Sequence, residues 1–282
     1  MKMKKSAIIF TSVTVCIMVA LLIGIILIEP QAESDINESM QDAVLHENDK
    51  IDFFGIPVNP GFISAVTTTL ILVVFAALVR IFAIPRFKMK PGKFQLLLET
   101  LVNFFDSLAK QNSPHKNGFL GAYIFAAGCY IFVSTLLELI GLQWTSIAGE
   151  SVSLGAPLAD INGAIALGCL SYLIILSGGI SSNGFVGVGR TLKEFSLPIS
   201  MSFRLFGALL SGLLVTELVY HFLALSFVLP VVVGVLFTLL HAVIQSYVLV
   251  MLTSLFYGEV SEPGIKKEKK IKSKRGVAVA EK

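Results

Sequence analysis

The chain has 282 residues, of which 55% are hydrophobic and only 15% are charged. With a mean hydropathy of +0.81, this composition excludes a soluble globular domain and indicates a polytopic membrane protein. The net charge of +3 hides a segregation, because basic residues gather at 2–5, 80–93 and 266–275 while residues 29–52 are mostly acidic. The positive-inside rule therefore predicts that the basic segments are cytoplasmic.

The first predicted span covers residues 7–28 and follows a basic start, as in a membrane anchor or a signal peptide. The apolar stretch is long for a signal peptide, and no good cleavage site follows it, so an uncleaved anchor is favoured. The acidic residues that follow, up to about residue 60, are expected on the exterior side. A second span is predicted at 62–84, and its end overlaps the basic segment that begins at Arg80.

Residues 93–110 differ from the predicted spans, because apolar side chains recur there at steps of three and four among polar ones. This spacing predicts an amphipathic helix that lies along the cytoplasmic membrane surface. The apolar positions are Phe94, Leu97, Leu98, Leu101, Phe104, Phe105 and Leu108.

The rest of the chain completes an all-α polytopic fold of about six spans. The further spans are predicted at 118–142, 161–179, 194–225 and 231–257. A polar loop at 143–160 and a glycine-rich loop at 178–189 separate them. Six crossings place both termini in the cytoplasm. The chain divides into an anchor or signal segment (1–30), an exterior segment (31–60), a membrane domain (61–260) and a basic tail (261–282).

Arg204 lies deep in the apolar segment 194–225. An arginine at the centre of a membrane helix costs about 2.5–3.5 kcal/mol on insertion scales. Such a residue is retained where the bundle interior or a wet cavity receives it, so an ion or proton path is the first hypothesis. The alternative is a structural arginine that reaches a lipid head group or binds the carbonyls of a broken helix.

Two pairs of polar residues in the second half have the spacing of one helix face. Glu217 and His221 are four residues apart, as are His241 and Gln245. Buried carboxylates and histidines need partners or water, and chains of them carry protons across membranes. In the alternative interpretation, Glu217 and His221 form a pair near the outer membrane surface. His241 and Gln245 would then make hydrogen bonds that hold helices together.

Three more polar residues accompany these pairs near predicted helix ends. Glu138 lies in the third span, and Asp160 with Asn162 opens the fourth. Asp160 has the alternative role of capping that helix, because its side chain can accept a hydrogen bond from a free backbone N–H. Together with Arg204, the set indicates an ion pathway.

Several chemistries are excluded by missing motifs. The glycine-rich stretch lacks the Gly-Lys-Ser/Thr ending of a phosphate-binding loop, and no nucleophile elbow or paired Cys/His metal spacing is present. Cys16, Cys129 and Cys169 all lie in apolar stretches, so they are interpreted as small core residues. The chain is therefore predicted to have no enzyme activity of its own, no cofactor or metal, and no nucleic-acid partner.

Four motifs in order resemble the family of subunit a of F-type ATP synthases. They are Pro91-Gly92-Lys93-Phe94-Gln95, Pro157-Leu158-Ala159-Asp160-Ile161-Asn162, the arginine-bearing Pro198–Gly207 and the glutamine-bearing Ile244–Thr253. The resemblance implies a stator subunit of the cell (inner) membrane, with two long, tilted final helices and two half-channels for H⁺ or Na⁺. Arg204 would face the carboxylates of a rotating ring of small subunits, and Gln245 would line the path. The implied partners are the ring, the peripheral stalk subunit b, the catalytic head through the complex, and membrane lipids.

The chain departs from the family pattern at four positions. Ala208 replaces an asparagine, and Leu213 and Arg190 stand where glutamates are expected. Glu217 and Glu194 each follow one turn later. Thr238 stands at the expected histidine, with His241 three residues on. A displacement of about one turn keeps the helix face, so Glu194, Glu217 and His241 stay candidates for a channel shifted in depth.

Two other functions remain open. One is a self-contained secondary transporter in which Arg204 binds an anionic substrate between broken helices. The other is a structural membrane scaffold, which would tolerate the loss of the Arg204 charge.

Overall fold

The computed structural model describes residues 14–16, 19, 23, 50–53, 55–115, 117–147, 149, 151–221 and 229–262, without the side chains of 217, 220, 221, 229 and 230. Most of the predicted first span, the acidic segment up to residue 49 and the basic tail lie outside these residues.

Five helices in the described part of the chain are long and apolar enough to cross a membrane. They are α3 (Pro60–Leu78), α5 (Gly118–Glu138), α6 (Ile161–Asn183), α8 (Ser196–His221) and α9 (Leu229–Ser261). The apolar helix of α3 continues through a π-helical segment, η1 (Val79–Ala83), and a 3₁₀ turn, η2 (Ile84–Arg86). The predicted all-α polytopic fold is thereby confirmed.

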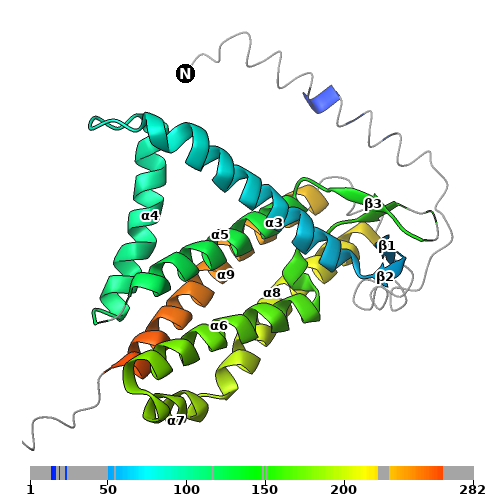
Figure 1. The fold of residues 1–282 in the computed structure, drawn as a ribbon. Coiled ribbons are helices and arrows are strands. Elements are labelled where there is room, and N and C mark those ends of the chain that lie inside the picture. Colours follow the sequence, from blue (N-terminus) through cyan, green and yellow to red (C-terminus); the bar gives the residue numbers. More distant parts are fainter. Residues whose placement is uncertain are drawn as a thin grey trace, which may run out of the picture.

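The predicted amphipathic helix is α4 (Lys93–Asn112), which leaves the end of η2 and leads back to the start of α5 (Figure 1). Its second half packs on α5, where the Phe105 ring meets Phe125 edge to face at 5.5 Å and Ala109 is fully buried. Its first half leaves Phe94 and Leu97 exposed. The second half of the apolar face of α4 therefore packs in the protein core, and the first half is exposed.

Two short hairpins, which were not predicted, occupy the loops expected on the exterior side. Strands β1 (Ile51–Phe53) and β2 (Ile56–Val58) pair antiparallel, and so do β3 (Gln143–Thr145) and β4 (Ser151–Ser153). The Ile147 N–H donates to the Lys50 carbonyl at 3.0 Å, so the two loops touch. Their contact places the start of α3 and the end of α5 at the same end of the bundle.

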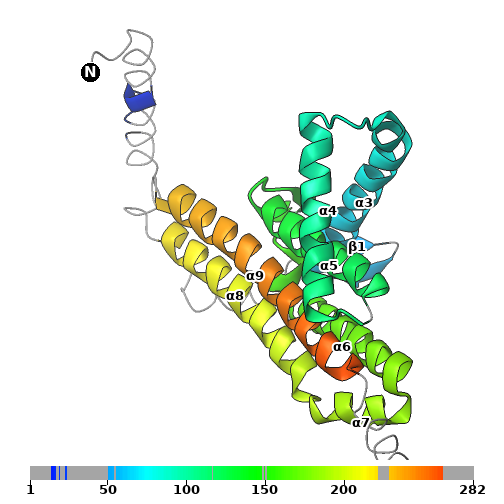
Figure 2. The ribbon, with the colours of Figure 1, turned by 90° about the vertical axis from the view of Figure 1, so that its left-hand side faces the viewer.

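Helix α9 is the centre of the bundle, with α5, α6 and α8 packed around it (Figures 1 and 2). Its middle is fastened to α5, because the Ser246 hydroxyl donates to the Gly128 carbonyl at 2.9 Å. Apolar side chains from all four helices form one core. Its fully buried members include Ile124, Ile131, Ile175 and Val250.

The C-terminal end of α9 is held by hydrogen bonds from three other helices. Asn112, the last residue of α4, donates to the Ser254 hydroxyl at 2.7 Å. Asn183, at the end of α6, donates to the Val260 carbonyl at 3.0 Å. Arg190 of α7 (Phe185–Lys193) donates to the Glu262 carbonyl at 2.9 Å. This end of α9 is therefore fixed to the rest of the fold.

The glycine-rich stretch 178–189 is helical, and the prediction of a loop there was wrong. Gly178 and Gly179 lie within α6, and the chain turns only at Gly184, whose φ is 58°. A Cβ on Gly187 would lie 2.0 Å from the Gly179 carbonyl oxygen, so the backbones of α6 and α7 touch. Close packing between small residues outweighs the low helix propensity of glycine.

Candidate functional site

Arg204 lies in an unbroken stretch of α8 and its side chain is exposed. At 1.5 Å per residue, it is about 12 Å from the start of α8 and about 26 Å from its end. In the described part of the chain, no hydrogen bond or ion pair involves its guanidinium. The alternative in which Arg204 binds the carbonyls of a broken helix therefore finds no support.

The face of α8 around Arg204 is exposed and partly made of small residues. Ser200 and Gly207 lie one turn to either side, and Phe203 is 61% exposed. A Cβ on Gly207 would meet no atom within 4 Å. Small side chains on both sides of a charged one leave room for a neighbouring helix to approach closely.

The opposite face of α8 is fixed against α6. Met201 and Leu205 are buried, and a Cβ on Gly168 of α6 would lie 3.0 Å from the Pro198 carbonyl oxygen and 2.3 Å from the Ser202 hydroxyl. That hydroxyl donates back to the Pro198 carbonyl at 2.7 Å. Because α6 and α8 pack at backbone distance only two residues before Arg204, the direction of the arginine is set by a rigid contact.

Gln245 is buried, with 5% of its surface exposed, and its Oε1 atom has no hydrogen-bond partner among the described residues. It stands midway along α9, about 24 Å from either end. A buried amide oxygen left unpaired costs about 1–3 kcal/mol. Buried polar atoms of this kind call for a specific explanation, such as water or an ion that reaches them.

His241 contacts α8 at a glycine. Its ring atoms Cε1 and Nδ1 lie 3.1 Å from the position of a Cβ on Gly212, and its ring centroid is 5.8 Å from that of Phe237. Gly212 follows Arg204 by two turns, and Gln245 follows His241 by one. Because α8 and α9 lie side by side and antiparallel (Figure 2), Gln245 lies at the level of the α8 segment between Gly212 and Arg204.

A second group of predicted residues gathers at the end of the bundle that carries the hairpins. Glu138 is the last residue of α5. Asp160 caps α6, since its Oδ1 accepts from the Asn162 N–H at 2.8 Å. Its Oδ2 accepts from the Asn59 side chain at 3.2 Å, so one carboxylate joins the starts of α3 and α6. The capping interpretation of Asp160 is confirmed, and Asn162 is exposed in the first turn of α6.

The remaining candidates lie at opposite ends of α8. Glu217 and His221 fall in its last turns, near the same hairpin end, and their side chains are outside the described residues. Leu213, one turn before Glu217, is 3.9 Å from the position of a Cβ on Gly155, in the loop after β4. Glu194 is half-buried in the turn between α7 and α8, at the other end.

Sequence reasoning missed two residues on α8 and α9. Gly212 receives His241, and Thr253 has a fully buried hydroxyl without a partner among the described residues. Thr253 follows Gln245 by eight residues, so the two lie close to one face of α9. That spacing could have identified Thr253 from the sequence. The role of Gly212 could not be identified in this way, because it depends on contact between two helices.

The chain resembles known proteins over the helices that carry this site. A family model described as ATP synthase A chain matches residues 62–258. ATP synthase subunit a of Histophilus somni (strain 129Pt) is 27% identical over 205 residues, which cover 59% of this chain and 75% of that protein. ATP synthase subunit a of Haemophilus influenzae (strain PittEE) is 24% identical over 238 residues, covering 70% and 88%. The match to the family model extends from the first turn of α3 to the last turns of α9.

Proposed function

The chain belongs to the ATP synthase A chain family, and from that premise we propose that it forms the stator side of the ion path. As a member, it is a non-catalytic membrane subunit of an ATP synthase. In the proposal, H⁺ or Na⁺ enters and leaves through two half-channels that are separated at Arg204. The arginine faces carboxylates on a rotating ring of small subunits, so that ion flow drives rotation.

The exposed guanidinium of Arg204 carries the proposal. A permanent charge facing lipid without a partner is unfavourable, and guanidinium stays protonated at any physiological pH. A ring carboxylate at about 4 Å, with an effective dielectric constant of about 20, would attract it by about 4 kcal/mol. This attraction keeps the facing carboxylate ionised, and hydration keeps it weak enough for the ring to move on.

The positions of the other candidates support two routes of access. Glu138, Asp160, Asn162, Glu217 and His221 lie toward the hairpin end, Gln245 and His241 lie between the ends, and Glu194 lies at the opposite end. In the proposal, the hairpin-end group lines one half-channel and leads to Gln245. Glu194 belongs to the other.

The orientation and partners follow from the charge segregation and the family. In the proposal, residues 61–260 form the membrane domain in the cell membrane, and residues 31–60 lie outside. Both termini are cytoplasmic, which places α7 and the end of α9 on the cytoplasmic side (Figure 1). The peripheral stalk subunit b holds the chain still, and the complex links it to the catalytic head.

Cysteine cross-linking in the assembled complex tests whether the Arg204 face meets the ring. In a chain freed of Cys16, Cys129 and Cys169, Gly207→Cys is expected to form a disulfide with a cysteine placed beside the ring carboxylate. Leu173→Cys is the matched control, because Leu173 is 56% exposed on α6, away from α8. Cross-linking by the control alone, or by neither variant, would contradict the proposal.

Replacing Gln245 by leucine separates a conducting role from a structural one. Leucine has a similar volume and removes the unpaired buried oxygen, so the thermal unfolding midpoint of the purified complex should stay equal or rise. ATP-driven ion uptake into inverted vesicles should nevertheless fall by about tenfold or more, since a polar step of the path is lost. Gln111→Leu, at an exposed position of α4, should change neither. A lower midpoint with normal uptake would assign Gln245 to helix packing instead.

A further inference from the structure

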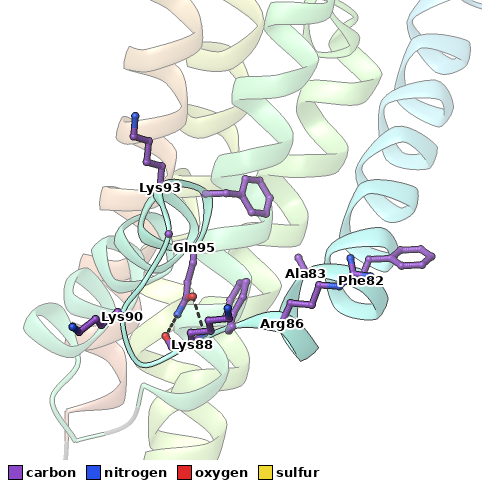
Figure 3. Close-up of a pocket in the computed structure, with 10 residues that line it drawn as sticks. Phe82, Ala83, Arg86, Lys88, Lys90, Lys93 and Gln95 are labelled. Carbon is purple, nitrogen blue, oxygen red and sulfur yellow. Dashed lines mark hydrogen bonds between the residues drawn. The ribbon is translucent and has the colours of Figure 1, made fainter.

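A basic pocket of about 440 Å³ lies at the corner where α3 and η2 lead into α4 (Figure 3). Ten residues line it, and four of them are cations: Arg86, Lys88, Lys90 and Lys93. None of the ten is acidic. The pocket therefore has a concentrated positive charge that its own lining does not balance.

The shape of this basic pocket is set by Gln95 in the first turn of α4. The Lys88 N–H donates to its Oε1 at 3.1 Å, and its Nε2 donates to the Lys88 carbonyl at 3.0 Å (Figure 3). These two hydrogen bonds tie the turn to the helix, so the cations project from a defined backbone. The nearest acid along α4, Glu99, accepts from the same Gln95 amide at 2.7 Å.

The four cations have no acidic partners in the described part of the chain. The ion pair recorded there for α4 joins Lys110 to Asp106, near the opposite end of the helix. In Figure 3 the side chains of Lys90 and Lys93 extend outward from the turn. Lysine ammonium groups on flexible stems can turn toward an anion that enters between them.

The basic pocket also lies at the end of an apolar helix that is long enough to cross a membrane. It follows directly on the apolar span Pro60–Arg86, and α4 continues from it as an amphipathic helix. Phe82 and Phe94 line the pocket and are about half exposed. Apolar side chains beside a cluster of cations match a ligand with a negatively charged head and apolar tails.

We propose that this pocket binds the head group of an anionic phospholipid from the adjoining leaflet. Arg86 and Lys88 contact the phosphate, Lys90 and Lys93 form the rim, and the acyl chains lie along the exposed apolar side chains of α3 and α4. A zwitterionic lipid offers the same phosphate but cancels its charge, so it binds more weakly. This site lies apart from the residues proposed to conduct the ion, and its occupancy does not depend on their roles.

Photolabelling of the purified whole complex tests the proposal. The complex is reconstituted into phosphatidylcholine vesicles that carry a minor fraction of photoactivatable phosphatidylglycerol, or of photoactivatable phosphatidylcholine in the second arm. Peptide mapping should find the phosphatidylglycerol label on residues 82–95. Arg86→Gln/Lys88→Gln should reduce that label by about tenfold, because two of the four cations are lost. Lys110→Gln/Lys193→Gln removes the same charge elsewhere and should leave the label unchanged.

Further arms decide between this lipid and other ligands. Arg86→Lys/Lys88→Arg keeps the charge and should keep the label, which excludes simple misfolding as the cause of a loss. Equal labelling by both lipids would mean an unselective lipid layer and would overturn the proposal. Displacement of the label by added inorganic phosphate would point to a free phosphate site. Protection of residues 82–95 by the stalk subunit, without lipid label, would assign the surface to a protein contact.

Discussion

Replacing Arg204 by alanine is expected to reduce ATP-driven ion uptake into inverted membrane vesicles to background, with the complex still assembled. The change removes the Arg204 charge from the exposed face of α8. In the proposed mechanism, the ring carboxylates would then lose their partner and the half-channels their separation. The packing of α8 does not use this side chain, since Met201 and Leu205 on the other face are buried. Loss of an exposed side chain usually changes the free energy of unfolding by less than about 0.5 kcal/mol.

The control for this variant is Arg190→Ala. Arg190 has a hydrogen-bonding role at the end of α9, donating to the Glu262 carbonyl, so its loss should affect stability more than uptake. Ion uptake by the two variants can be compared only if both complexes assemble equally, which is measured by subunit content after purification. Normal uptake by the Arg204→Ala complex would remove the arginine from the coupling path and favour a scaffold. Transport by the purified chain without a ring would favour a secondary transporter.

Gly187→Ala is expected to destabilise the chain strongly, whereas Gly189→Ala on the same helix should not. A Cβ at 187 would lie 2.0 Å from a backbone oxygen of Gly179, and backbone cannot move aside as a flexible side chain can. Overpacking of this kind costs about 1–3 kcal/mol. A Cβ at 189 meets nothing within 4 Å, and alanine has the higher helix propensity, so that variant should be neutral or more stable.

The measurement for this pair is the thermal unfolding midpoint of the purified complex, followed by ion uptake. Displacement of α7 in Gly187→Ala should also lower uptake, because α7 leads directly into α8 and its arginine. Equal midpoints for the two variants would show that α6 and α7 are not packed at backbone distance.

The membrane-crossing helices and α4 were predictable because they depend on the composition of single segments. The run of apolar residues identifies each span in the described chain, and the alternation at 93–110 identifies α4. Asp160 was predictable as a cap from its place before an apolar run. The hairpins were not, because strands of three residues such as Ile51–Phe53 are too short to show an alternating pattern.

The face of α8 that carries Arg204 could not have been assigned from periodicity. In a membrane helix the side chains that face lipid are as apolar as those that pack, so Phe203 and Leu205 give no contrast. Their exposure, 61% and 2%, follows from the contact of α8 with α6 and α9. Arg204 itself was found from the energetic cost of its charge, while the meeting of His241 with Gly212 depends on the register between two distant segments.

The hydrogen bonds that hold the end of α9 also have a mechanical consequence. Asn112, Asn183 and Arg190 hold the C-terminal end of α9, which lies beside the start of α8. A sideways push on Arg204 would act about 12 Å from the start of α8, on a short lever arm. The two packed helices, α8 and α9, would then resist bending near Arg204 and bend more easily toward their opposite end. In the proposed mechanism, a force exerted on Arg204 by the ring would therefore reach the rest of the subunit with little loss to bending.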